Sequence, residues 1–547
     1  MGNEHIATLT RRSVLGLAAA AVAGGVVGCR TSTTGADFGG NDTLTLPNHI
    51  APKPVEGAIV SAMDGVPAGL TAMPNPLPTS TSGPPGSGKE FTTFQINWGS
   101  PARPYEQNEY WQEFNKRLNV DYKPTLVPAD AYDTRLATVL SSGQIPDMTF
   151  LHTTSANAQQ AIQDGAFAEL SSVLGGDKIE QYPNLANVPT YQWEASAINN
   201  GLYGIPCDLP YVNATHLYRR DWAAEIGLTR QPKDADEFKT LMTEISKTRG
   251  RYGLGGFSGG VSGFVNAMFR VPNNWRDEGG KLINHIETDE YEQALGYLRE
   301  LWQGGAFHPD ALPLAEQGAK DRELFESGVT SWQVGSADHW YMSGGVSRLR
   351  AKNPKADVTP ILPMGHDGGK YTFWSSPGFY ALIAISAQAA ENEERLGEIL
   401  RIMNYLRAPI ASEEGFFLRY GTEGIHFSYD DNRYPVTKDS PAPTDRDAMF
   451  YTGMVPVIFY YPDPQDVRDT MSYTEEVTRN TVKDPTVGLF APSSASSAAK
   501  LEELTQDYVN GIVSGRRPPG DLQRFRDDWR QQGGDKLRQE LMDARAK

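Results

Sequence analysis

Beyond a polar N-terminal stretch, the sequence alternates between strand and helix signals, and this alternation constrains the fold more than any other feature. Residues 90–98 (EFTTFQINW) have the every-second-residue apolar pattern of a half-buried strand. Tyr110, Phe114 and Leu118 then recur at the spacing of four that is typical of a helix. Residues 147–151 (DMTFL) indicate the next strand. The pattern predicts an α/β fold, in which helices cover sheets and ligands bind beyond the carboxyl ends of the strands.

Helical signals continue to the C-terminus. We expect Asp130 to cap a helix that ends at Gly143, because these residue types favour the two helix ends. Further amphipathic stripes lie at residues 291–302, 396–406 and 501–512, and a charged helix follows a break at 515–521. The 547 residues leave room for more than one hydrophobic core, so we expect two lobes.

The N-terminus has the features of an export signal that ends in a lipid anchor. Arg11 and Arg12 resemble a twin-arginine signal, and the apolar run 14–27 is too short to span a bilayer. Small residues precede Cys29, as in a bacterial lipobox. We therefore predict that residues 1–29 are a lipoprotein signal and that a lipidated Cys29 holds the protein at the outer face of the membrane. A hydrophobic N-terminus that is not cleaved is the alternative.

Composition limits the partners and the redox chemistry. The formal net charge of −17 disfavours nucleic acid, because binding to phosphate backbones needs clustered Lys and Arg. If Cys29 carries lipid, Cys207 is left without a partner and the exported protein has no disulfide. Residues 30–89 are rich in Thr, Gly, Pro and Ser, which predicts a flexible linker without a core.

Several blocks of sequence, taken in order, resemble one family. They are residues 143–147 (GQIPD), 200–206 (NGLYGIP), 217–222 (LYRRDW) with 225–228 (EIGL), 236–238 (DEF), 297–302 (YLRELW) with Gly305 and 308–310 (HPD), 419–427 (RYGTEGIHF), and 529–534 (WRQQGG) before Glu540. They resemble the extracellular solute-binding proteins of ATP-driven carbohydrate importers, above all the lipoprotein branch that binds oligosaccharides and alginate oligomers. The resemblance spans roughly residues 90–547.

The resemblance implies two α/β lobes of the periplasmic-binding-protein type, joined by hinge strands around a cleft that closes on a ligand. Neither lobe would be contiguous in sequence. The first would comprise residues 90–211 and about 378–450, and the second residues 212–377 and about 451–547. Ligand binding between the lobes would then shift an equilibrium between open and closed forms.

A sugar ring presents a flat C–H face and a rim of hydroxyls, so its receptor combines aromatic platforms with polar side chains. The side chains that offer this chemistry at predicted loop positions are Trp98, Asp208, Tyr211, Trp275, Asp338, Trp340, Trp374 and Ser376. For each tryptophan, packing in a core or anchoring a loop is the alternative. Four others sit in helical patterns and are expected to pack against the body, namely Trp111, Trp222, Trp302 and Trp529.

The resemblance implies a monomeric receptor that captures an oligosaccharide and passes it unchanged to an ABC permease driven by a cytoplasmic ATPase. No catalytic residue and no cofactor are then expected. One alternative is an exported hydrolase, because residues 256–260 (GFSGG) match the G-x-S-x-G pattern with Ser258 as nucleophile, or because paired carboxylates could cleave a glycan. Another is a receptor for a peptide or other nutrient on the same scaffold.

Metal and charge signals are weak. Residues 429–433 (YDDNR) are a candidate for the structural calcium that some alginate-binding relatives hold, but they lack the spacing of a calcium loop, and a hairpin turn is preferred. The nine histidines show no zinc-binding spacing. The acidic net charge argues against a uronate ligand unless arginines such as Arg103, Arg219 or Arg276 line the cleft.

Overall fold

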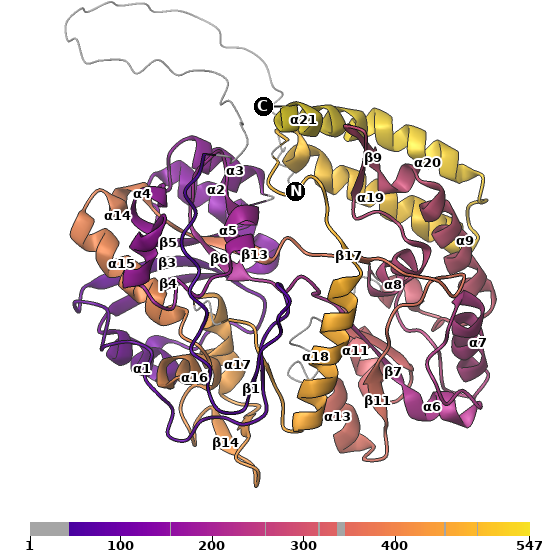
Figure 1. Ribbon diagram of the computed structural model, residues 1–547, viewed down its shortest axis with the longest axis horizontal. Helices are drawn as coiled ribbons and strands as arrows, with labels where there is room; N and C mark the ends of the chain where they lie inside the picture. Colours follow the sequence, from indigo (N-terminus) through magenta and orange to yellow (C-terminus); the bar gives the residue numbers. More distant parts are fainter. Residues whose placement is uncertain are drawn as a thin grey trace, which may run out of the picture. The chain divides into compact units, whose positions relative to one another are not determined.

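The computed structural model describes residues 43–153, 155–257, 259–314, 318–335, 345–452, 456–489 and 491–546. Two large hydrophobic cores divide this part of the chain. The first takes its buried residues from 91–207 and 379–449, and the second from 218–364 and 491–541. Each core has its own sheet and its own helices, so the chain forms two lobes whose segments alternate along the sequence (Figure 1).

The first lobe is built on a five-stranded sheet. Its strands, in spatial order, are β4 (Asp121–Pro128), β3 (Glu90–Asn97), β5 (Met148–Leu151), β13 (Phe379–Ile385) and β6 (Ile205–Asp208). β3 pairs in parallel with β4 and β5, whereas β13 runs antiparallel to both β5 and β6. The carboxyl ends of β3, β5 and β6 therefore lie at the same edge of the sheet as the amino end of β13.

The helices of this lobe follow the predicted apolar spacing. They include α1 (Glu109–Leu118), α2 (Tyr132–Ser142), α5 (Thr190–Ser196), α15 (Glu393–Leu406) and α16 (Glu413–Tyr420). α1 buries Tyr110, Phe114 and Leu118, as predicted. Gly143 ends α2 in the left-handed conformation, with φ 69°. The expectation for Asp130 is wrong, because it lies in a short 3₁₀ turn and Ala131 occupies the capping position without a side-chain bond.

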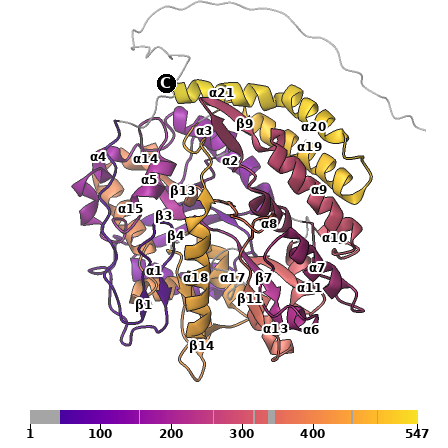
Figure 2. The same cartoon turned by 45° about the vertical axis from the view of Figure 1, so that its right-hand side comes forward.

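The second lobe has a smaller sheet and more helix. Its strands, in spatial order, are β10 (Trp332–Gly335), β7 (Thr215–Arg219) and β11 (Val358–Pro360), with β7 antiparallel to both neighbours. Its helices include α7 (Ala235–Ser246), α8 (Gly259–Phe269), α9 (Asp289–Gln303), α11 (Gly318–Glu326), α13 (Gly345–Lys352) and α18 (Pro464–Arg479). The C-terminal helices α19 (Ser494–Ser514), α20 (Asp521–Trp529) and α21 (Asp535–Ala546) complete it, and α19 packs against α9 and α20 (Figure 2). No helix among the residues that the structure describes combines the length and the apolar character needed to cross a bilayer.

Within the described residues, the chain passes between the two cores at three places. These crossing segments lie between Cys207 and Tyr218, between Met364 and Phe379, and between Met449 and Ala491. The first and second are held together by Ser376, whose amide donates to Tyr211 O at 2.8 Å and whose hydroxyl donates to Pro210 O at 2.6 Å. The third approaches the first where the Val457 amide donates to Asp208 Oδ2 at 3.3 Å. Hydrogen bonds thus keep the three crossings side by side.

The prediction of a flexible linker over residues 30–89 is wrong from residue 43 onward. Residues 43–89, which we call the strap, pack against the body of the protein. Leu44 and Leu46 contact the first core, and Leu70 is fully buried. The strap also contributes β1 (Ala58–Ile59) and β2 (Gly69–Leu70), which form a small sheet with β16 (Phe459–Tyr460) of the third crossing.

Carboxylates of the first lobe fix the far end of the strap. Glu414 accepts hydrogen bonds from the backbone amides and hydroxyls of Ser80 and Thr81, at 2.8–3.1 Å. Glu398 accepts two more from Ser87, at 2.6 and 2.7 Å. The composition of the strap correctly indicates that it has no core of its own, but it does not reveal that its few apolar residues bury themselves in cores made by other segments.

Candidate ligand-binding site

The carboxyl edge of the first sheet carries an exposed cluster of rings. Trp98 directly follows β3, and 60% of its surface is exposed. His152 directly follows β5, and Tyr380 lies at the start of the antiparallel β13. The sheet pairing brings these three positions together: the imidazole of His152 meets the ring of Tyr380 edge-on at 5.0 Å, and the Trp98 side chain is near enough to act on the Tyr380 phenol, whose pKa it lowers against the effect of burial.

Two more rings reach this edge from the 3₁₀ segment Asp447–Thr452, which packs against β3. The centroid of the Tyr451 ring lies 5.6 Å from that of Phe150 and 6.0 Å from that of Tyr380. The centroids of the Phe450 and Tyr451 rings are 5.2 Å apart. Phe450 is 37% exposed. We call this group the aromatic edge; its members are the exposed or half-buried Trp98, His152, Tyr380, Phe450 and Tyr451, and the fully buried Phe150, which contacts three of them.

Within the aromatic edge, His152 and Tyr380 are uncharged at neutral pH. Burial lowers the pKa of His152 below its ordinary value, although the nearby Asp133 carboxylate acts in the opposite direction, so the imidazole is uncharged at neutral pH. Burial raises the pKa of Tyr380, which keeps its phenol protonated. The guanidinium of Arg419 lies 5.7 Å from the Phe450 ring. The edge therefore offers flat apolar faces together with neutral hydrogen-bonding groups, an arrangement that suits a ligand with an apolar face and a polar rim.

Asp208 ends β6 at the same sheet edge, but its carboxylate already has partners. Oδ1 accepts a hydrogen bond from the guanidinium of Arg407, whose side chain is only 1% exposed. Oδ2 accepts the hydrogen bond from Val457 described above. The sequence predicts that Asp208 contacts the ligand, but in the structure its carboxylate has a structural role. It links the first and third crossing segments to Arg407 of the first lobe.

Tyr211 and Ser376, also predicted to bind ligand, lie in the crossing segments. The Tyr211 ring packs on Tyr191 at 4.4 Å, and its amide donates to Gly65 O of the strap at 3.3 Å. The hydroxyl of Ser376 accepts from the Gly378 amide at 3.0 Å while it donates to Pro210. Their positions suit a hinge rather than a ligand surface.

Trp275 and Trp374 belong to the second lobe. Trp275 is 5% exposed and packs on Trp529 with ring centroids 6.0 Å apart, so a ligand contact is not supported and core packing accounts for this residue. Trp374 is half-buried, and its indole donates to Val271 O at 2.7 Å. The other predicted residues, Asp338, Trp340, Ser258 and Cys29, lie outside the described residues.

The expected core tryptophans behave as predicted in two cases and nearly so in the others. Trp222 is 3% exposed, with the guanidinium groups of Arg219 and Arg251 within 4.3 Å of its ring. Trp529 is also buried. Trp111 and Trp302 are half-buried on their helices.

The second lobe also presents a sheet edge. β10 ends at Gly335. Just before β10, Thr330 forms a parallel bridge with Tyr252, so the segment around Tyr252 runs in the same direction as the segment that leads into β10. The Gly256 amide, just beyond that segment, donates to Asp321 Oδ1 at 2.6 Å. Burial raises the pKa of Asp321 despite this bond. Asp321 therefore fixes the backbone of the glycine-rich loop that contains the G-x-S-x-G pattern.

The arginines proposed to accommodate a uronate are each paired. Arg103 binds Asp445 and Glu109, Arg219 binds Asp221, and Arg276 binds Glu278 and Glu290. Their charge is thus already compensated within the protein.

Residues 429–433 form the expected hairpin turn. β14 (Phe427–Tyr429) pairs antiparallel with β15 (Pro435–Thr437), and Asp430 Oδ1 accepts the Asn432 and Tyr434 amides at 2.9 and 2.8 Å. One carboxylate oxygen of the candidate calcium site is therefore used inside the turn. Among the described residues, no group of three or more His, Cys, Asp and Glu side chains is arranged to hold a metal ion.

Comparisons with known proteins agree with this architecture. No family model matches the chain. The polygalacturonan/rhamnogalacturonan-binding protein YtcQ of Bacillus subtilis is 23% identical over 450 residues, which are 79% of this chain and 87% of that protein. Lipoprotein LipO of the same organism is 22% identical over 462 residues, 81% of this chain and 89% of that protein.

Among solved structures, an HMO-binding, ABC-transporter-associated solute-binding protein from Bifidobacterium longum infantis is similar with a TM-score of 0.59 and 14% sequence identity. The match covers 85% of this chain and 99% of that one. The chain has the fold of the two-lobed ABC solute-binding proteins. The fold class and the resemblance predicted from the sequence blocks are thereby confirmed.

Sequence reasoning missed most of the aromatic edge. His152 follows the carboxyl end of a strand, as Trp98 does, so the rule that selected Trp98 would also have found it. Tyr380 lies at the amino end of β13, where that rule does not look. Phe450 and Tyr451 follow no strand, and no local signal marks their approach to β3.

Proposed function

We propose that this protein is the substrate-binding lipoprotein of a carbohydrate ABC importer and that it captures an oligosaccharide at the aromatic edge. The observation that carries the proposal is Trp98, an exposed indole at the carboxyl edge of the first sheet, set beside half-buried rings. The descriptions of similar proteins support it, since YtcQ is a polygalacturonan/rhamnogalacturonan-binding protein and a similar structure is that of an HMO-binding protein.

The chemistry of the edge matches a sugar ring. Covering about 100 Å² of the C–H face on an indole contributes roughly 2–3 kcal/mol, at about 25 cal/mol per Å². Association entropy and lobe closure offset much of this gain, so hydroxyl contacts must accompany the stacking. Tyr380, His152 and Trp98 bring hydrogen-bonding atoms to the same place as the rings.

Delivery follows from the two-lobe construction. A ligand that contacts both lobes only in the closed form shifts the open-to-closed equilibrium by its differential binding energy. The closed protein then presents itself to a membrane permease and releases the sugar unchanged. A lipidated Cys29 keeps the receptor next to that permease, and LipO, a similar lipoprotein, supports this anchoring.

The decisive experiment combines a binding assay with product analysis. The mature protein is incubated with kestose, an alginate oligomer and a galacturonate oligomer, its melting temperature is recorded, and the sugars are then examined for cleavage. We expect at least one sugar to raise the melting temperature and to be recovered intact, since a ligand that binds only the folded state stabilises it. The absence of any stabilising sugar would contradict the proposal.

The hydrolase alternative has its own readout. The segment before Ser258 does run from a strand-like bridge at Leu254 into α8, which is the local order that a nucleophile elbow requires. Cleavage products that disappear in the Ser258→Ala variant would show that the protein is an enzyme. Intact sugars with both proteins would support a receptor without catalysis.

A further inference from the structure

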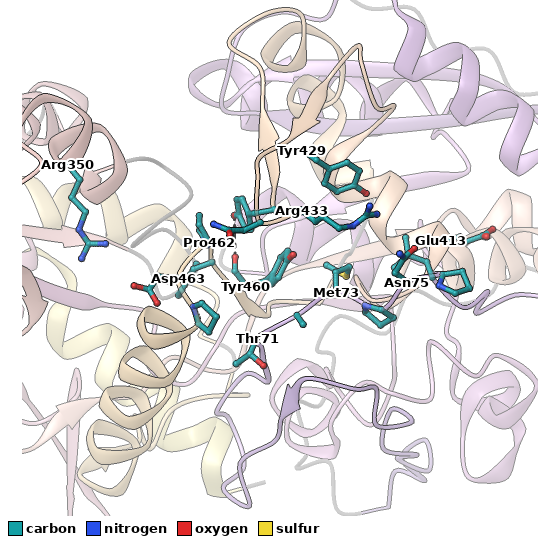
Figure 3. A pocket seen from close by; sticks show the side chains of 18 residues that line it. Thr71, Met73, Asn75, Arg350, Glu413, Tyr429, Arg433, Tyr460, Pro462 and Asp463 are labelled. Carbon is teal, nitrogen blue, oxygen red and sulfur yellow. Dashed lines mark hydrogen bonds between the residues drawn. The ribbon is translucent and has the colours of Figure 1, made fainter.

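A cavity of about 1000 Å³ lies beside the third crossing segment (Figure 3). Its walls come from residues 71–77 of the strap, residues 429–434 of the hairpin and residues 460–464, together with Arg350 and Glu413. None of the six residues of the aromatic edge lines it. We call it the hinge cavity.

The floor of the hinge cavity is aromatic. The rings of Tyr434 and Tyr460 lie 5.1 Å apart, and the Tyr434 hydroxyl donates to Tyr460 O at 3.4 Å. Tyr460 also belongs to β16, where it pairs with Leu70 of the strap. Figure 3 shows Tyr460 between the hairpin side chains Tyr429 and Arg433 and the strap residue Thr71. These two rings are only 9% and 6% exposed, so they make a rigid floor, and the half-buried ring of Tyr429 offers more surface on which a flat ligand face can stack.

The rim carries hydrogen-bonding groups of both kinds. Arg433 is exposed, its guanidinium lies 5.2 Å from the Tyr429 ring, and it forms no ion pair with the described residues. Asn75 and Asn432 add exposed amides, and Glu413 adds a carboxylate at one end. Because sugar hydroxyls both donate and accept, a neutral saccharide matches such a rim better than a ligand of one charge.

The walls of the hinge cavity belong to both sides of the hinge. The hairpin packs with Phe416 and Tyr420 of the first lobe. Arg350 lies on α13, whose buried residues pack with β7 and β11 of the second lobe, and its guanidinium donates to Asp466 of α18 at 3.0 Å. Movement of one lobe relative to the other would therefore change the shape of the cavity.

We propose that the hinge cavity is a second binding site for a short neutral saccharide, and that its occupancy is coupled to opening and closing of the lobes. The proposal rests on the proposed function only for the chemical class of the ligand. A ligand that fits the cavity in one lobe arrangement stabilises that arrangement, so it must change the affinity of the aromatic edge for its own sugar.

Calorimetric titration with kestose, raffinose and maltotriose tests the proposal. The unmodified protein is compared with the aromatic-edge variant Trp98→Ala and with two hinge-cavity variants, Tyr429→Ala and Arg433→Gln. Val436→Ala is the matched control, because Val436 is an exposed residue of the same hairpin that does not line the cavity. Melting temperatures without sugar show that each variant folds.

We expect two binding events with the unmodified protein for at least one of the sugars. Trp98→Ala should remove one event, and the cavity variants should remove the other and change the remaining dissociation constant about five-fold or more. A single event that Trp98→Ala abolishes and the cavity variants leave unchanged would overturn the inference and leave the proposed function standing. A single event lost only in the cavity variants would support the hinge site and contradict the aromatic edge, and no binding by any of the three sugars would overturn the hinge site.

Discussion

The carboxylate of Asp208 and the guanidinium of Arg407 form an ion pair that is almost completely shielded from water, with side-chain exposures of 14% and 1%. The pair joins the end of β6 to the residue that follows α15, and the other carboxylate oxygen of Asp208 accepts a hydrogen bond from the Val457 amide of the third crossing. A residue that the sequence suggests as a sugar ligand is thus a structural link at the base of the hinge.

Asp208→Ala should therefore destabilise the protein without removing its binding surface. Removing the carboxylate that compensates the buried Arg407 charge costs about 3 kcal/mol or more. Urea unfolding measures this loss, and a sugar titration of the folded fraction should show an affinity within a few-fold of the original. If the Asp208→Ala variant instead has normal stability and no longer binds sugar, Asp208 is a ligand-binding residue.

Trp98→Ala should weaken binding at the aromatic edge and leave stability almost unchanged, because the indole is exposed. Loss of roughly 2–3 kcal/mol of stacking corresponds to about a 30- to 150-fold higher dissociation constant. Tyr105→Ala is the matched control, since Tyr105 is an exposed ring of the same lobe that is not part of the aromatic edge. Equal effects of the two substitutions would contradict the assignment.

Glu414→Gln should loosen the strap. Burial acts to raise the pKa of Glu414, but the hydrogen bonds from Ser80 and Thr81 outweigh it and lower the pKa below its ordinary value. The ionised form is thus favoured by folding, and its contribution is lost as the pH falls through the lowered pKa. We expect faster proteolysis of residues 43–89 in the variant, from a local loss of about 1–3 kcal/mol. Glu394→Gln, at an exposed position on α15, serves as control, and equal cleavage in both variants would show that Glu414 does not fix the strap.

Stability should fall in weak acid because the buried His216 and the half-buried His285 are held in the uncharged form. Burial lowers the pKa of His216 and of His285 to about 4, so the unfolded chain takes up protons first as the pH decreases below about 6.5. Each contributes up to about 3 kcal/mol that is present above pH 6.5 and lost towards pH 4. In urea unfolding between these pH values, the free energy of unfolding of His216→Asn should depend less steeply on pH than that of the unmodified protein. The control His49→Asn, at an exposed position, should not show this change. An unchanged slope in His216→Asn would show that folding does not lower the pKa of His216.

The parts of the fold that could be predicted are those set by local pattern. The strand at 90–97, the strand at 148–151 and the helix that buries Tyr110 and Phe114 follow from apolar spacing alone. The path of the strap could not be predicted, because Leu70 finds its burial against residues that are distant in sequence. Trp275 illustrates the same limit, since nothing near it in the sequence reveals that Trp529 covers its ring.

The packing of the strap also decides where a force on the N-terminus is felt. Its β2 pairs with β16 of the third crossing, its Gly65 carbonyl binds Tyr211 of the first, and a Cβ at Gly69 would lie 2.5 Å from the sulfur of Met471 in α18. Closer to its start, however, the strap is fixed to the first lobe, where Leu44 and Leu46 contact the core and the Asn48 amide donates to Gly176 O. A pull applied at residue 43 is therefore taken up by the first lobe before it reaches the crossing segments.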